Sequence, residues 1–410
     1  GQHVAAICLS LDIPLNLEPE HLEGVATIAQ RVLDEGTNQH PGASYAESLE
    51  NIGAVLDGSV GLSASQLFVS VPVPRLPEAL ALLAEAARTP ELNQADIDRH
   101  QQLRLAEIEQ TLANSAALAQ LTFRTATVRR RWRASRPAGG TRESVAAITP
   151  AAVREFHADY YRPEGGTLIV SGDFDAGLHA AVEAAFGDWL VPGTVDAVHH
   201  VPTARLPHRW LIDRPGAVQA DVRLGALGID RADPRWPDVQ VATHAVGGAF
   251  LSRLNKVLRE ELGFTYGVHL VNQPMRNRGL LAVQGSFRTE VLAEAVARAG
   301  SLLDLTARPL TDAEVTQAVA FHLGSSPLRY STAHQVTENL AALIAAGVTA
   351  EFINANARAL AQVTPASATS ALAELLPPDR LTLVVVGDAD ALVEPLARAG
   401  WPTTRHAAQA

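Results

Sequence analysis

Residues 148–187 read ITPAAVREFHADYYRPEGGTLIVSGDFDAGLHAAVEAAFG, and residues 363–400 read VTPASATSALAELLPPDRLTLVVVGDADALVEPLARAG. Each stretch predicts a helix, a turn, a buried strand ending in Gly-Asp, and a second helix. The Thr-Pro pairs at 149 and 364 and the Gly-Asp pairs at 172 and 387 share one offset of 215 residues. Two residue pairs that recur at the same offset indicate that the chain contains a duplicated structural unit.

The duplication predicts two domains, which suits a chain of 410 residues that exceeds the usual size of a single core. The stretch VPGTVDAVHHVPTARLPH between the halves is rich in Pro and lacks periodicity, as linkers do. We therefore place the N-terminal domain at 1–195, the linker at 196–208 and the C-terminal domain at 209–410.

Strand and helix patterns alternate within each half. The strands QLFVSVPV and LLAVQGSF stand beside long helical stretches at 93–126 and 310–343. Strands that include hairpin neighbours, mixed with helices, predict an α+β fold, with an antiparallel-rich mixed sheet in each half and helices packed mainly on one face. No Gly-rich phosphate loop is present in the sequence.

Composition excludes several classes of protein. A net charge of −11 argues against a nucleic-acid binder and against a polybasic membrane anchor. The single cysteine, Cys8, cannot form an internal disulfide, which favours a reducing compartment and a cytoplasmic, bacterial-like location. No apolar run has the length that a membrane span needs, and no basic-then-apolar segment opens the sequence. We therefore expect neither a membrane segment nor a signal peptide.

Residues 247–266, GGAFLSRLNKVLREELGFTY, are the most informative stretch for function. Apolar residues at steps of three and four predict a helix with one core-facing side, made of Leu251, Leu254, Leu258 and Leu262. Gly263 then stands where a helix C-cap is expected, because a residue without Cβ adopts the left-handed conformation cheaply.

A short strand from Phe264 to Leu270 is expected to follow that helix. Arg259 in the last helical turn and Tyr266 in the strand could then reach the same space. Taken alone, Arg259 also suits the negative end of a helix dipole, and Tyr266 suits a half-buried strand.

Histidine spacing gives no metal site. His199, His200 and His208 form the one cluster among 14 histidines, and two histidines four residues apart occur nowhere. A bare histidine pair in a Pro-bounded linker is usually exposed to solvent, so we assign no metal and no cofactor to this chain.

Seven arginines crowd into 19 residues of this acidic chain, at positions 124, 129, 130, 131, 133, 136 and 142. Charge runs usually face water, so a solvated basic face is the first interpretation. A patch for an acidic peptide or an acidic partner subunit is the alternative.

The stretch GGAFLSRLNKVLREELGFTYGV resembles the C-terminal-domain motif of the M16 (pitrilysin or insulinase-like) metallopeptidases, and the duplicated α+β half resembles that family's repeat. The resemblance covers essentially the whole chain and implies the LuxS/MPP-like metallohydrolase type of fold. In the family, the Arg and Tyr of the motif bind substrate near the scissile carbonyl. The corresponding substrate-binding residues are Arg259 and Tyr266.

The zinc motif of that family is His-x-x-Glu-His on a helix of the first domain. Two His at i and i+4 reach one metal, and the Glu between them is the general base. The matching segment is GVATIAQRVLDEGT, where Thr27, Gln30 and Arg31 hold those three positions. Thr is a poor zinc ligand, Gln takes no proton, and Arg31 puts a fixed positive charge where the metal would sit.

A glutamate further along the chain is the third zinc ligand in the family. Glu107, in RLAEIEQTL, is the best match. One carboxylate cannot hold the metal alone, and we expect Glu107 to be a solvated residue on a helix face.

A retained Arg and Tyr with a lost zinc motif resembles the non-zinc subunit of a heterodimeric M16B peptidase. The resemblance implies a homologous partner that brings zinc and its Glu base, a peptide substrate held between the two chains, and no activity for this chain alone. Two alternatives stay open. One is a catalytically silent structural subunit, like the M16-fold core subunits of respiratory complexes, and the other is a module that binds the leader segment of a peptide.

Overall fold

A computed structural model describes residues 3–191, 193 and 196–406 of the chain. These residues fall into two compact units that do not follow the order of the chain. Unit 1 contains the residues up to Ile108, Pro137–His199 and Pro327–Ala350, and unit 2 contains Glu109–Arg136, His200–Ser326 and the residues from Glu351 on.

Unit 1 is built on a four-stranded antiparallel sheet in the order β2-β3-β1-β4. Its strands are β1 Val4–Leu11, β2 Val55–Val60, β3 Ser65–Pro72 and β4 Thr167–Ser171. Its helices are α1 Val25–Arg31, α2 Ala43–Asn51, α3 Leu76–Arg88, most of α4 Gln94–Ala113, α6 Arg142–Ala146, α7 Pro150–Tyr160, α8 Gly177–Phe186 and α13 Ala333–Ala345.

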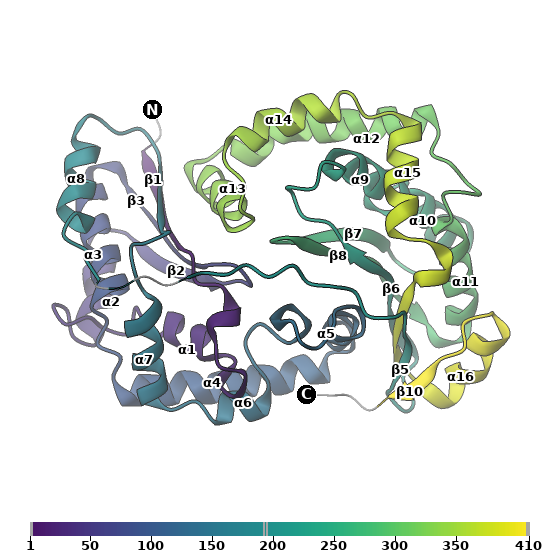
Figure 1. The fold of residues 1–410 in the computed structure, drawn as a ribbon, viewed down its shortest axis with the longest axis horizontal. Coiled ribbons are helices and arrows are strands. Elements are labelled where there is room, and N and C mark those ends of the chain that lie inside the picture. The colour runs from purple at the N-terminus through teal and green to yellow at the C-terminus, as the bar shows by residue number, and fades with distance from the viewer. Residues whose placement is uncertain (1–2, 192, 194–195, 407–410) are drawn as a thin grey trace. The chain divides into compact units, whose positions relative to one another are not determined.

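Unit 2 is built on a six-stranded mixed sheet in the order β10-β5-β9-β6-β8-β7, whose neighbouring strands β7 and β8 can be followed in Figure 1. Its strands are β5 Arg209–Asp213, β6 Gln219–Gly228, β7 Val268–Met275, β8 Arg278–Arg288, β9 Thr382–Gly387 and β10 Thr404–His406. Its α-helices are α5 Ser115–Thr127, α9 Trp236–Thr243, α10 Arg253–Asn255, α11 Leu292–Leu303, α12 Asp312–Ser325, α14 Glu351–Leu360, α15 Pro365–Leu375 and α16 Ala389–Arg398. Two π-helical segments, His244–Gly248 and Lys256–Glu261, flank α10.

The structure repeats the unit that the sequence predicts. The order β2-β3-β1-β4 in unit 1 recurs as β7-β8-β6-β9 in unit 2. Thr149 caps α7 and Thr364 caps α15 by accepting a backbone N–H, and each is followed by Pro at the first helical position. The α+β fold class and the duplication are therefore confirmed.

One helix covers the second face of each sheet, and it comes from the other half of the chain. In unit 1, Cys8 of β1 and Ile169 of β4 pack against Ala341 of α13. In unit 2, Leu118 of α5 packs with Ile212 of β5 and Val386 of β9. The strands β1 and β9 are buried along nearly their whole length, so both of their faces need an apolar cover.

The two predicted long helices are each broken. The stretch 93–126 is divided at Asn114, whose side chain accepts the backbone N–H of Ala117 and so starts α5. The stretch 310–343 is interrupted by a 3₁₀ turn at Ser326–Tyr330 before α13 begins. The sequence did not reveal these breaks, because the apolar residues on both sides of each break follow one helical periodicity.

The predicted domain bounds of 1–195, 196–208 and 209–410 describe the duplicated segments and stay a prediction. The compact units are composed differently, because α5 and α13 each belong to the unit of the opposite half. Residues 192 and 194–195, at the predicted end of the first domain, lie outside the described residues. Among the described residues, no helix has the length and apolar character that crossing a membrane requires.

The helix that covers the second face of the sheet in unit 2 can be tested by truncating Leu118. Its side chain is completely buried, so Leu118→Ala should lower the free energy of unfolding by about 2–5 kcal/mol. Urea denaturation followed by circular dichroism measures the change. The control is Leu103→Ala on α4, where an exposed side chain should change stability by about 0.5 kcal/mol or less. Equal effects of the two substitutions would contradict the packing described.

Candidate functional site

The corner between α10 and β7 carries the predicted substrate residues, and its helix differs from the predicted one. Leu254 and Leu258 are fully buried and Leu262 packs at the edge of the same core, as expected. Leu251 is 69% exposed, so its predicted place on the buried face is wrong. The helix starts only after Ser252, whose side chain caps it at the backbone N–H of Asn255. Leu251 therefore lies in the preceding loop.

The helix ends at Gly263, as predicted, but the strand that follows it begins later than predicted. Gly263 has φ +62°, a left-handed conformation that a residue without Cβ adopts at little cost. The backbone N–H of Gly263 donates to the carbonyl of Arg259 at 3.1 Å, which closes an αL-type helix end. The strand that follows begins at Val268 and not at Phe264.

A buried asparagine holds the corner together. The side-chain amide of Asn255 donates to the carbonyl of Ala249 at 3.2 Å and accepts the backbone N–H of Val268 at 3.0 Å. It thereby joins the loop before the helix to the strand after it. Gly247 lies so near the backbone of Leu270 in β7 that a Cβ would stand 2.3 Å from the Leu270 nitrogen. Gly247 of the motif therefore permits the close approach of the first π-helical segment and β7.

Arg259 lies within the second π-helical segment, a distortion that is often found at functional sites. Its Nη2 donates to the carbonyl of Phe250 at 3.0 Å, and its Nε donates to Oε1 of Glu260 at 2.8 Å. The guanidinium carbon lies 3.8 Å from the centre of the Phe250 ring. Only 16% of the Arg259 side chain is exposed.

Tyr266 has the opposite environment. It is 99% exposed, and its hydroxyl has no hydrogen-bond partner among the described residues. Its backbone is held by the flanking residues, because the Thr265 hydroxyl donates to the carbonyl of Ser286 and accepts the backbone N–H of Gly267. The half-buried strand position considered from the sequence is wrong. The corner thus offers an exposed phenol donor on an anchored stretch of backbone, and a mostly covered guanidinium.

No recorded contact joins Arg259 to Tyr266, so the structure places both on one corner without bringing them together directly. The two positions on either side of Gly263 could serve one extended ligand. Each presents hydrogen-bond donors, which suits acceptors such as peptide carbonyls.

An ion pair occupies the positions that correspond to the zinc motif. Arg31 at the end of α1 donates from Nη1 and Nη2 to the two carboxylate oxygens of Glu107 in α4, at 2.9 and 3.0 Å. Arg104, one turn earlier on α4, donates to the same carboxylate at 2.9 Å. Glu107 lies on the face of α4 with 40% of its side chain exposed, as expected, but it is not unpaired, since two arginines hold it.

The electrostatics of this site follow from the pairing. Burial alone would raise the pKa of Glu107, but hydrogen bonds from Arg31 and Arg104 outweigh it and hold the pKa below its usual value. The carboxylate is therefore charged and fully engaged. The guanidinium of Arg31 provides the positive charge that a metal would provide.

The residues present do not fit a zinc ion. Thr27 is a weak ligand, and Gln30 is buried with its amide over Gly58 of β2. Arg31 repels a cation and competes for Glu107. Among the described residues, no group of three or more His, Cys, Asp or Glu side chains is arranged to hold a metal ion.

The arginine cluster is only partly a solvated face. Arg124 and Arg133 are largely buried, and Arg124 donates to the carbonyl of Ala134 at 3.1 Å. Burial, with a smaller effect of Arg133, lowers the pKa of Arg124 to about 10. Arg129, Arg130 and Arg131 are exposed. The buried members hold the loop after α5, and the exposed members form a small basic surface.

The linker histidines are engaged separately. His199 lies 2.7 Å from a carboxylate oxygen of Asp12, whereas the rings of His200 and His208 pack at a tilt against Trp132 and Trp210. They do not converge on one point.

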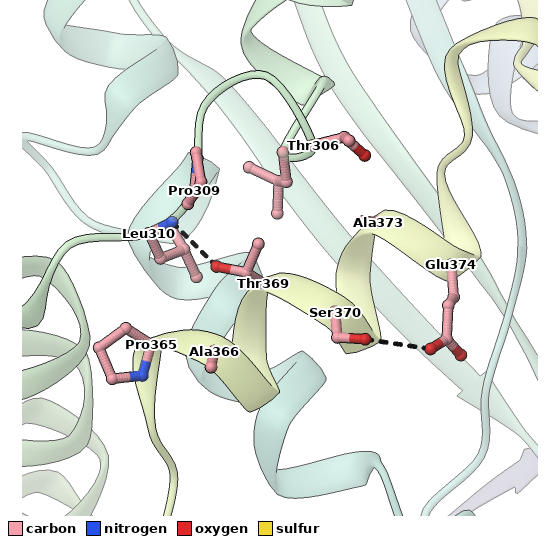
Figure 2. A pocket seen from close by; sticks show the side chains of 10 residues that line it. Thr306, Pro309, Leu310, Pro365, Ala366, Thr369, Ser370, Ala373 and Glu374 are labelled. Carbon is pink, nitrogen blue, oxygen red and sulfur yellow. Dashed lines mark hydrogen bonds between the residues drawn. The ribbon is translucent and has the colours of Figure 1, made fainter.

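A pocket of about 690 Å³ lies in unit 2 between α15 and the loop at 305–310 (Figure 2). Its lining is mostly small and apolar, and Glu374 is the one ionisable side chain among the lining residues. Glu374 accepts a hydrogen bond from Ser370 one turn earlier on the same helix. Since the pocket includes neither Arg259 nor Tyr266, we do not assign the function to it.

Sequence reasoning missed three residues of these sites, namely Phe250, Asn255 and Arg104. Asn255 could have been suspected, because a polar residue between Leu254 and Leu258 has to be satisfied when the helix is buried. Nothing in the sequence pattern distinguishes Phe250 from its neighbour Leu251.

Comparison with known proteins points to one family. The profile described as "Insulinase (Peptidase family M16)" matches residues 2–141, and the profile described as "Peptidase M16 inactive domain" matches residues 147–321. An "uncharacterized zinc protease" of Mycobacterium tuberculosis is 26% identical over 325 residues, which cover 76% of this chain and 72% of that protein.

A respiratory protein and a solved structure are also similar. Subunit 1 of the mitochondrial cytochrome b-c1 complex of Caenorhabditis elegans is 23% identical over 290 residues, covering 66% of this chain and 58% of that protein. The crystal structure of a peptidase M16 inactive domain from Pseudomonas fluorescens superposes with a TM-score of 0.85 at 23% identity, over 94% of this chain and 93% of that chain. The structural likeness supports the two-domain α+β fold.

The ion pair at the zinc position makes a prediction about stability and pH. Because water screens partly exposed charges, Glu107→Gln should lower the free energy of unfolding by about 1 kcal/mol at pH 7. The folded pKa of Glu107 is lowered, so the contribution is present above the unfolded pKa of about 4.3 and is lost as pH falls through the folded pKa. Urea titrations at pH 7 and pH 3 measure this. Glu47→Gln on α2 is the control, and an equal loss at both pH values would contradict the assignment.

If the fold places residues 27, 30 and 31 as the zinc motif of the family does, substitutions at these positions should introduce zinc binding. Thr27→His, Gln30→Glu and Arg31→His together remove the competing guanidinium and place two imidazoles near Glu107. Zinc at about 100 times its Kd should then stabilise this variant by about 2.7 kcal/mol, seen as a rise in Tm, and leave the parent chain unchanged. Adding Glu107→Ala should weaken the effect. If zinc does not change the Tm of this variant, the backbone does not place the two introduced histidines and Glu107 where they can bind one zinc ion.

Proposed function

Because the chain belongs to the M16 peptidase family, we propose that it is the non-zinc subunit of a two-chain M16B peptidase and binds peptide for a homologous, zinc-bearing partner. The observation that carries the proposal is the Arg31–Glu107 ion pair in place of the metal, in a chain that keeps Arg259 and a fully exposed Tyr266. The partner would hold both the zinc and the carboxylate base.

The role of this chain is to hold the peptide and to stabilise charge. When a peptide carbonyl is attacked, negative charge grows on its oxygen, and a fixed donor lowers the barrier. The Tyr266 hydroxyl has no competing partner among the described residues, so it can donate to that oxygen without first breaking a bond. Arg259 can hold the peptide backbone or donate to the same oxygen. This chain alone would then bind peptide without cleaving it.

A structural subunit is the second candidate function. The similarity to a cytochrome b-c1 complex subunit favours it, because that relative's name places it in a larger assembly. A structural role makes no use of an exposed phenol donor. The two candidates therefore differ in what Tyr266 does.

Tyr266→Phe separates them. In the complex of this chain with the M16 protein of the same organism that has an intact His-x-x-Glu-His motif, loss of one preorganised donor should lower kcat about 10²–10³-fold. Cleavage of a quenched fluorescent peptide measures the rate, and size-exclusion chromatography shows that the subunits still associate.

Tyr330→Phe is the matched control, since Tyr330 belongs to unit 1 and not to the corner, and the substitution should leave kcat unchanged. Neither chain alone should cleave the peptide. Unchanged hydrolysis by the Tyr266→Phe complex would contradict the proposed role of Tyr266 as a donor. Full activity of the zinc-bearing chain alone would favour a structural role for this chain.

A further inference from the structure

Phe250 lies in an unusual position for an apolar residue. It is 74% exposed, so its ring is left mostly in water, yet the ring centre stands 3.8 Å from the guanidinium carbon of Arg259. Its backbone carbonyl also accepts Nη2 of the same arginine at 3.0 Å. Leu251, the next residue, is similarly exposed, and no recorded contact joins it to Arg259.

Phe250 and Glu260 restrain different parts of the guanidinium. The Phe250 ring covers one face, which is the favourable geometry for a cation over an aromatic quadrupole. The edge formed by Nε and Nη2 faces the Glu260 carboxylate, at 2.8 and 2.7 Å. Among the described residues, Nη1 alone lacks a hydrogen-bond partner.

This arrangement decides which ligand suits Arg259. Arginine binds a carboxylate best through two parallel N–H groups, and its Nε/Nη2 edge is one such fork. Glu260 already occupies that fork and neutralises its charge. A neutral carbonyl needs only one donor, which Nη1 can supply.

We propose that Phe250 and Glu260 are positioning residues that hold Arg259 with Nη1 as its single outward donor, so that the corner binds an internal peptide carbonyl in preference to a terminal carboxylate. The inference rests on the proposed peptide-binding function. It also explains how the site can release a cleaved fragment, because hydrolysis turns the bound carbonyl into a carboxylate that the corner holds less well.

The first test needs no activity. Phenylglyoxal modification of the isolated full-length chain, followed by peptide mapping, gives the reaction rate of Arg259. Phe250→Ala should raise that rate about three- to tenfold, which corresponds to loss of one cation–π contact. Phe250→Trp should restore the parent rate, and Leu251→Ala should leave it unchanged. An unaltered rate in Phe250→Ala would overturn the positioning role.

The second test uses the assembled peptidase and a double-mutant cycle. Phe250→Ala should raise KM for the quenched peptide about three- to tenfold, and it should have no further effect in an Arg259→Ala background. Equal effects in both backgrounds would mean that Phe250 acts on the peptide directly, which overturns the proposal. An inactive parent assembly would refute the proposed function, and the modification test would still decide the role of Phe250.

The preference for a carbonyl is tested through Glu260. Glu260→Gln frees the fork of Arg259, so the fragment that ends in the new carboxylate should inhibit this variant about tenfold more strongly than the parent. The same fragment with an amidated end should inhibit both equally. Equal inhibition of parent and variant by the carboxylate fragment would contradict the assigned role of Glu260.

Discussion

The constraint on which the whole structure depends is that an inner strand of each sheet is buried on both of its faces. Seven of the eight residues of β1 and all six of β9 are buried. A sheet of this kind must be covered twice, since exposing one face would leave apolar strands in water. Each half of the chain covers one face of its own sheet and receives α5 or α13 from the other half for the second. The duplicated units therefore depend on each other for their cores.

The two duplicated halves share one fold but differ in the side chains of their candidate sites. At the end of α1, Arg31 replaces a metal's charge with a guanidinium and keeps Glu107 ionised. This pairing satisfies a carboxylate that would otherwise lie partly buried and uncompensated. At the corner before β7, the buried Asn255 joins the loop before the helix to the strand after it, and Tyr266 between them is exposed. The first site has an ion pair that does not fit a metal, whereas the second presents an exposed phenol beside a mostly covered guanidinium.

Much of the fold could be predicted, because repeated anchors and alternating patterns are local. The Thr-Pro helix starts and the Gly263 helix end followed from the properties of single residues. Leu251 was placed on the buried face because helical periodicity was extended past the Ser252 cap, where the helix in fact begins. The partners of Glu107 were missed for a different reason, since Arg31 lies on α1, distant in the sequence from α4.

The sequence by itself determined that one α+β unit occurs twice, that Thr27, Gln30 and Arg31 cannot bind zinc, and which Arg and Tyr resemble the substrate residues of the family. These statements need only residue identity and spacing. The tertiary structure alone decided that Arg31 pairs with Glu107, that α5 and α13 exchange places between the units, and that Phe250 covers Arg259 while Leu251 does not. Each of these depends on contacts between residues far apart in sequence or on the path of one loop, and neither is encoded in a local pattern.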